Sequence, residues 1–227
     1  MNVLIIAAHP DDELLGCGGT VRKLADEGHV IYSCILCSTA NARHNRPDLE
    51  KLREYALRSS RMIGVQDSVG FDFDNIALNS VPHLDVVRAM ESAILRFRPE
   101  WIFTHHPGDL NIDHQVCYHA AMAACHLPQR LSTDLPPHQI KKIMLCEIPS
   151  STDWTTMLDP AFVPNLFVDI SATIDTKMEA LDLFEGALKP YPHSRSAENL
   201  RNLAKLRGAR VGLEYAEAFI TVRDVLV

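Results

Sequence analysis

Short apolar runs alternate with helical patterns along most of this chain, and this alternation limits the folds that the chain can adopt. Val3–Ala8 is a continuous apolar run, which is typical of a parallel strand covered on both faces. Gly16–Glu27 follows with the apolar spacing of a helix, and Gly28 stands at its C-terminal end. The alternation predicts an α/β fold: a Rossmann-like, mostly parallel, twisted sheet with helices on both faces.

The same pattern continues toward the C-terminus. The further predicted strands are Val30–Cys37, Ser68–Phe73, Trp101–His105, Ile143–Cys146, Leu166–Asp169 and Ala218–Val222, the last at a sheet edge. The further predicted helices are Pro47–Ile63, Leu84–Phe97, Asp113–Cys125, Thr173–Leu188 and Ala197–Val211. The proline-containing segment Leu127–Lys142 is predicted to be a surface loop. We therefore expect residues 1–227 to form a single domain with a C-terminal helical part packed on the sheet.

Composition narrows the classes of partner. The chain has 227 residues, of which 47% are hydrophobic, so it can bury a substantial core. Its formal net charge of −7 gives no electrostatic reason to expect nucleic acid or an anionic membrane as a partner. We find neither a membrane-spanning apolar run nor a secretory signal pattern, so we expect a cytoplasmic protein. Its six cysteines, including the Cys34/Cys37 pair inside a predicted strand, are then expected to be free thiols in the core.

Two polar clusters follow predicted strands. His9-Pro10-Asp11-Asp12-Glu13 comes directly after the first strand, and a segment from His106 to His114 follows Trp101–His105. In an open parallel sheet, ligands bind beyond the carboxyl ends of the strands where the strand order reverses. If these two strands are neighbours, the clusters face each other across one crevice.

The residue types favour a metal site that carries out hydrolysis. His9, Asp12 and His114 would supply two imidazoles and a carboxylate, and they would leave positions open for water and substrate. Asp11 would then be the general base, and Asn111 or a nearby histidine would donate a hydrogen bond to the developing oxyanion. The same ligand types also occur in iron oxygenases, but an additional acid beside the ligands favours hydrolysis. The alternative is that His9 is a core histidine and the two aspartates cap a helix.

Gly16-Cys17-Gly18-Gly19 raises a second alternative. These glycines open a helix after a strand, as in a phosphate-binding loop, but their spacing is not G-x-G-x-x-G. Close packing of the helix beneath a metal-binding turn explains them at least as well. A nucleotide-binding module without a metal is therefore kept as the alternative from another functional class.

At these motifs the chain resembles the LmbE-like, or PIG-L, deacetylase family. The resemblance rests on Ala8–Glu13, its continuation Gly16–Thr20, and Asp113-His114. Softer matches lie at Pro192–Ser196 and Tyr215–Phe219. Members are zinc-dependent amidases that remove acetyl groups from N-acetylglucosamine-type sugars. The resemblance thus implies an LmbE-like fold, a small N-acetylated sugar as the partner, and Zn²⁺ as the cofactor, with Fe²⁺ as a second candidate.

The resemblance also implies roles for individual residues. It implies that His9, Asp12 and His114 are zinc ligands and that Asp11 is the base. Many members have a histidine where this chain has Asn111, so Asn111 is either a neutral oxyanion donor or the charged role falls to His106 or His193. A related amidase with a different acyl group or carrier, such as a deformylase or a thiol-conjugate amidase, is the nearest alternative. Members often assemble, which leaves a homo-oligomer open.

Candidate substrate-binding residues lie at the same rim of the predicted sheet. Arg43 and Arg53 follow the second strand, and Asp74 follows the third. Arginines would bind a carrier phosphate or carboxylate, and an aspartate would bind sugar hydroxyls. His193 and Arg195 lie in a proline-flanked loop that is expected to close over the site.

Overall fold

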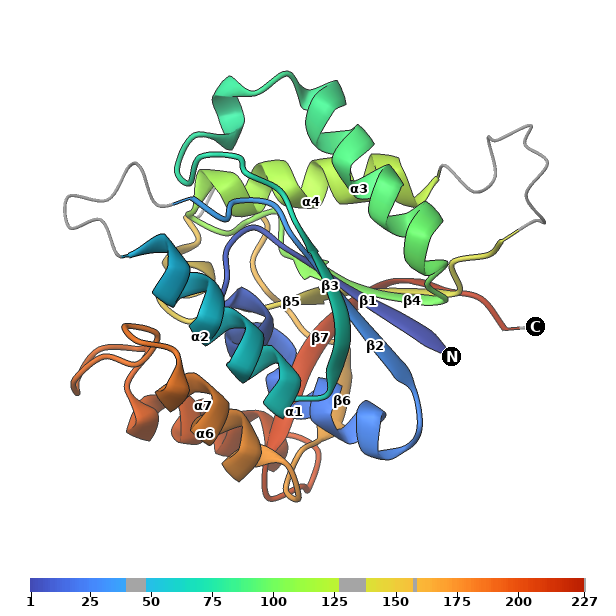
Figure 1. The fold of residues 1–227 in the computed structure, drawn as a ribbon. Helices are drawn as coiled ribbons and strands as arrows, with labels where there is room; N and C mark the ends of the chain where they lie inside the picture. Colours follow the sequence, from blue (N-terminus) through green and yellow to red (C-terminus); the bar gives the residue numbers. More distant parts are fainter. Residues whose placement is uncertain (40–47, 127–137, 157–158, 227) are drawn as a thin grey trace.

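A computed structural model describes residues 1–39, 48–126, 138–156 and 159–226 (Figure 1). Seven strands form one sheet in the order β3-β2-β1-β4-β5-β7-β6. The strands are β1 (Asn2–Ala7), β2 (Val30–Ile35), β3 (Val65–Gly70), β4 (Trp101–His105), β5 (Lys142–Cys146), β6 (Leu166–Asp169) and β7 (Ala216–Asp224). The helices are α1 (Asp12–Asp26), α2 (Leu49–Met62), α3 (His83–Phe97), α4 (Ile112–Cys125), α6 (Ile174–Leu183) and α7 (Ala197–Ala209), with short 3-10 turns η1 (Leu78–Ser80) and η2 (Thr152–Trp154).

The strand order reverses beside β1. Strands β3, β2, β1, β4 and β5 are mutually parallel, and β1 pairs with β2 on one side and β4 on the other. Val3 is in register with Trp101, so the two strands followed by polar clusters are neighbours. The polar residues that follow β1 and β4 therefore lie at the reversal, which is where ligands bind in open parallel sheets.

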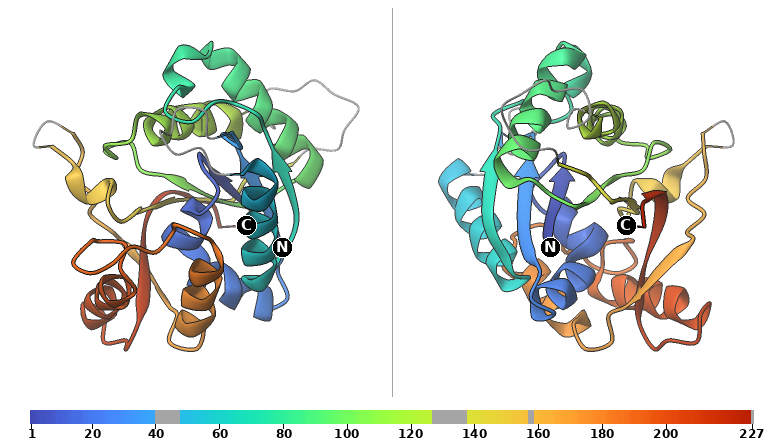
Figure 2. Two further views of the ribbon diagram at one scale, coloured as in Figure 1. Left: turned by 60° about the vertical axis from the view of Figure 1, so that its left-hand side comes forward. Right: turned by 90° about the vertical axis from the view of Figure 1, so that its right-hand side faces the viewer.

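Helices cover both faces of the sheet, and each face has its own apolar core. On one face α3 and α4 pack over a buried cluster that includes Leu4, Met90 and Ile102. On the other face α1, α2 and α6 pack over a cluster centred on Phe103 and Phe219, whose rings meet edge to face at 5.2 Å. Figure 2 shows the same three layers from two further directions. The predicted α/β class is confirmed.

The structure corrects several predicted boundaries. The helix expected from Gly16 begins at Asp12, because the acidic residues after β1 form its first turn. The third strand is Val65–Gly70 rather than Ser68–Phe73, and the helix predicted as Thr173–Leu188 ends at Leu183. The last predicted strand is not at an edge. β7 lies between β5 and β6 and is antiparallel to both, so β6 is the edge strand. Within the described ranges, no helix is long and apolar enough to cross a membrane.

Candidate metal centre and active site

The turn between β1 and α1 brings the Asp12 carboxylate beside His114 of α4. Asp11 is the N-cap residue of α1 and has a φ of 106°, a left-handed conformation that is uncommon outside glycine. Its backbone N–H donates to Oε2 of Glu13 at 3.1 Å, and the His9 N–H donates to Oδ2 of Asp12 at 2.9 Å. These bonds hold a tight turn in which the side chains of His9 and Asp12 meet.

Three ligand-type atoms lie at the spacing that a metal ion requires. Nδ1 of His9 lies 3.2 Å from Oδ2 of Asp12 and 3.2 Å from Nε2 of His114, and the last two atoms lie 3.3 Å apart. A tetrahedral zinc ion with bonds of about 2.1 Å holds its ligands roughly 3.4 Å apart. All three residues are buried, and their ligand atoms form one of the groups that could hold a metal. The structure thus brings the three predicted ligand residues together.

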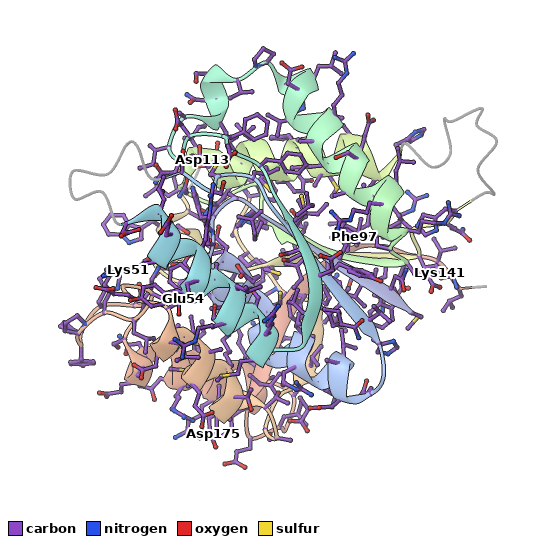
Figure 3. The ribbon with its side chains drawn as sticks, in the orientation of Figure 1. Lys51, Glu54, Phe97, Asp113, Lys141 and Asp175 are labelled. Carbon is purple, nitrogen blue, oxygen red and sulfur yellow. The ribbon has the colours of Figure 1, made fainter. Side chains whose placement is uncertain are left out.

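Each histidine of this triangle is held by a second carboxylate. Nε2 of His9 lies 2.9 Å from Oδ2 of Asp113, and Nδ1 of His114 lies 3.0 Å from Oδ2 of Asp109. Figure 3 labels Asp113 at the N-terminal end of α4, at the edge of the sheet where β1 and β4 end. A carboxylate on the far nitrogen is typical of metal-binding histidines, because it fixes the ring and its tautomer. Asp109 and Asp113 were not predicted, although both lie within the His106–His114 segment.

The two supporting carboxylates are themselves anchored. Asp113 accepts the backbone N–H of Leu78 at 3.0 Å and also the N–H of Ile76. Asp109 accepts hydrogen bonds from the hydroxyls of Thr152 at 2.7 Å and Ser151 at 3.0 Å. Both aspartates are 0% exposed. The orientation of the histidines is therefore set by segments that follow β3 and β5.

His105, the last residue of β4, is another residue that the sequence analysis left without a role. Its Nε2 accepts the backbone N–H of Ala8 at 2.9 Å, and its ring stacks on His114 with centroids 4.0 Å apart. Burial, with a contribution from His114, lowers the pKa of His105 to about 3, so the ring is neutral. His105 therefore packs the His114 ring in place without adding charge.

A second group of ligand-type residues shares His9 but suits a metal less well. It consists of His9, Cys37 and Asp113. The Asp113 carboxylate already accepts three N–H groups, and the Sγ of Cys37 lies 4.0 Å from it. Burial raises the pKa of the Cys37 thiol, which opposes formation of the thiolate that binds metals. The triangle of His9, Asp12 and His114 is the better site.

The electrostatics of the triangle also suit a cation. Burial lowers the pKa of His114, but Asp12 and Asp109 outweigh it and raise that pKa to about 10. Burial acts to raise the pKa of Asp12, but His114 reverses this and holds it well below its ordinary value. The cluster thus stabilises positive charge at the position that a metal would occupy.

The predicted base has a cationic neighbour. Nη1 of Arg195 lies 3.4 Å from Oδ2 of Asp11. The Arg195 Nε donates to the carbonyl of Pro149 at 3.1 Å and to the hydroxyl of Ser150 at 2.7 Å. Arg195 was predicted to bind substrate, and the structure places its guanidinium beside the predicted base.

The remaining predicted site residues are Asn111, His193, Arg53, Asp74 and Arg43. Oδ1 of Asn111 accepts the N–H of Asp113 and caps α4, and Nδ1 of His193 accepts the N–H of Arg195. Arg53 is exposed and lines a cavity of about 390 Å³ that Pro10 also lines. Asp74 accepts the hydroxyl of Thr39 at 2.6 Å. Arg43 lies outside the described residues.

Comparison with known proteins decides the family. Residues 4–125 match the PIG-L family, which is described as GlcNAc-PI de-N-acetylase. The chain belongs to this family. The uncharacterized deacetylase YaiS of Escherichia coli K12 is 28% identical over 143 residues, which cover 59% of this chain and 74% of YaiS. The diacetylchitobiose deacetylase of Thermococcus kodakarensis is 27% identical over 245 aligned residues, which cover 99% of this chain and 84% of that protein.

The PIG-L fold is also used for another reaction. The structure of GalB, the 4-carboxy-2-hydroxymuconate hydratase from Pseudomonas putida KT2440, matches with a TM-score of 0.81 at 19% identity, covering 100% of this chain and 98% of that one. Fold alone therefore does not set the chemistry. The family match and the deacetylase relatives identify this PIG-L chain as an enzyme of a hydrolytic de-N-acetylase family.

Proposed function

We propose that this chain is a zinc-dependent hydrolase that removes the acetyl group from a small N-acetylated amino sugar of the N-acetylglucosamine type. The observation that carries the proposal is the triangle of His9 Nδ1, Asp12 Oδ2 and His114 Nε2, with sides of 3.2 to 3.3 Å, in a chain of the PIG-L family. These three residues would hold the metal. When bound, a zinc ion supplies Lewis acidity, which lowers the pKa of water and polarises a carbonyl.

The chain's own residues would handle the protons. The Asp11 carboxylate takes a proton from the water that adds to the amide carbon, and it delivers that proton to the nitrogen when the C–N bond breaks. The products are acetate and the free amine. The Arg195 guanidinium holds Asp11 in position, and the amide N–H₂ of Asn111 is the proposed hydrogen-bond donor to the oxyanion. Arg53 and Asp74, at the rim, are proposed to bind the sugar or its carrier, with Arg43 and His193 as further candidates.

The nucleotide-binding alternative receives little support from the glycine segment. The Gly19 N–H donates to Oε1 of Glu217 at 3.0 Å, and the Thr20 N–H donates to its Oε2 at 2.7 Å. A carboxylate therefore already occupies the N–H groups that a phosphate would need, and it would repel that phosphate.

The test is a panel of substrates with two readouts. N-acetylglucosamine, a glycoside and a nucleotide-linked form of it, and N-formylglucosamine would be incubated with the enzyme, and free amine and carboxylate would be measured. Asp11→Asn should keep the bound metal and lose most turnover. Release of formate in preference to acetate would favour the deformylase alternative. Absence of both metal and amine release would refute the proposal, and a hydratase would release neither acetate nor amine.

A further inference from the structure

Helix α1 is broken immediately behind the metal-binding turn. Cys17 has φ of −147° and ψ of 15°, which divides Asp12–Asp26 into two helical segments. Leu15, Cys17 and Thr20 around the break are at most 2% exposed. A helix end leaves backbone carbonyl and N–H groups without intrahelical partners, and buried groups of this kind need partners from elsewhere.

An ion pair from two later elements supplies those partners. Nζ of Lys177 in α6 donates to the carbonyl of Leu15 at 2.8 Å, and Leu15 lies in the last turn of the first segment. Glu217 in β7 accepts the N–H groups of Gly19 and Thr20, the start of the second segment, at 3.0 and 2.7 Å. Nζ of Lys177 lies 2.7 Å from Oε1 of Glu217, so the pair joins both segments across the break.

Close packing of α1 explains the glycines around the break. A Cβ atom at Gly16 would lie 2.9 Å from Cβ of Cys146 and 2.9 Å from Cδ1 of Ile148, and one at Gly19 would lie 3.0 Å from Ile170. These distances are too short for any other residue without displacement of the neighbours. Packing therefore accounts for Gly16 and Gly19 without a bound phosphate.

Stability alone does not account for the ion pair. Lys177 and Glu217 are 7% and 6% exposed, and removing two charges from water costs about as much as their attraction returns. Apolar residues of similar volume often replace such a pair without loss of stability. The pair is instead connected to the site through one residue, because the Leu15 N–H donates to the Asp11 carbonyl at 2.9 Å while its carbonyl accepts from Lys177.

We propose that Lys177 and Glu217 are positioning residues that fix the direction of the first segment of α1 and thereby hold Asp11 and Asp12 in place for the metal. This inference rests on the metal site proposed above. Both residues lie outside residues 4–125, the segment that matches the family. The inference therefore gives a role to the C-terminal part of the chain.

The test measures Zn²⁺ affinity and thermal stability of Glu217→Gln. Zn²⁺ alone would be titrated into metal-free protein in competition with a chromogenic chelator, and Tm would be measured without metal. We expect the Kd for Zn²⁺ to rise on the order of tenfold, the lower end of the effect of residues that support metal ligands.

Two controls separate positioning from general destabilisation. Glu27→Gln makes the same change in an exposed pair at the C-terminal end of α1, where Glu27 lies 3.9 Å from Lys23. Met90→Ala removes a buried side chain of α3 on the opposite face and lowers Tm without touching α1. Both should keep Kd within about twofold of the wild type, since neither alters the break. A Zn²⁺ Kd for Glu217→Gln within about twofold of the wild-type Kd would overturn the inference. So would a Met90→Ala variant whose Kd rises as much, for each degree of Tm lost, as the Kd of Glu217→Gln.

A double variant covers the case in which Glu217→Gln fails to fold. Lys177→Met with Glu217→Gln leaves no unpaired buried charge, so it should fold and should still bind Zn²⁺ more weakly. Wild-type protein that binds no Zn²⁺ would refute the metal site and this inference together. If the double variant binds Zn²⁺ with the same Kd as the wild type, only the positioning role is refuted.

Discussion

The guanidinium of Arg195 lies 3.4 Å from the carboxylate of Asp11, and it is held there by Pro149 and Ser150. The arginine therefore donates through Nε to the segment that follows β5, while its Nη1 lies beside the proposed base. The guanidinium makes these contacts from separate nitrogen atoms of one rigid plane, whereas a lysine would have to make them from a single nitrogen. The relationship supports the proposal that Arg195 orients Asp11, a role that the sequence did not suggest.

Arg195→Lys should therefore lower kcat while leaving metal affinity unchanged. The charge is kept but the guanidinium is lost, and displacement of a reacting group by about 1 Å costs on the order of 10² in rate. Steady-state kinetics and Zn²⁺ titration would be compared with Arg201→Lys, which changes an exposed pair with Asp175. A kcat equal to that of the control would remove Arg195 from the site.

Asp113→Asn should weaken metal binding. The amide cannot accept the His9 N–H while keeping both backbone N–H donors, so the ring loses its orientation. Loss of such a supporting carboxylate typically costs about 10- to 100-fold in metal affinity. Asp85→Asn, on the exposed surface of α3, is the matched control. Equal Zn²⁺ affinities for the two variants would contradict the role of Asp113.

Asn111→Ser separates capping from catalysis. Serine keeps an N-cap oxygen for the Asp113 N–H but has no amide N–H₂. We expect Tm close to the wild type and a kcat lower by about 10², the typical loss for an oxyanion donor. Asn111→Ala should also lose about 1 kcal/mol of stability, because the cap is removed. A wild-type kcat in the serine variant would restrict Asn111 to its capping role.

Glu13→Gln should change how stability depends on pH. Burial, with a contribution from Asp11, raises the pKa of Glu13 from 4.5 to about 7. The folded state thus keeps a proton that the unfolded state has lost, so this group's contribution to stability falls as pH rises from about 4.5 to about 7. The variant should gain on the order of 3 kcal/mol relative to the wild type between pH 5 and 8. Urea unfolding of the metal-free proteins would measure this, and parallel pH profiles would contradict it.

Elements that depend on local pattern could be predicted from the sequence. Val3–Ala8 is apolar throughout because β1 is covered on both faces. The sequence left the pairing of β1 with β4 as a condition, and the structure meets that condition. The clustering of His9, Asp12 and His114 was predictable once β1 and β4 were taken as neighbours, because the ends of neighbouring parallel strands meet. Contacts between distant segments could not be predicted from the sequence. Nothing in the local pattern shows that Arg195 reaches Asp11, or that Glu217, placed between two alanines of β7, reaches Gly19.

The position of β7 in the sheet has a consequence for the order in which the chain can assemble. β6 is hydrogen-bonded to β7 and to no other strand among the described residues, although β7 follows it by two helices. During synthesis β6 therefore has no pairing strand until β7 has been made. Glu217, which belongs to β7, is synthesised long after His9 and Asp12. If Glu217 positions the metal site as proposed, a nascent chain contains all three proposed metal ligands before it reaches its full affinity for the metal.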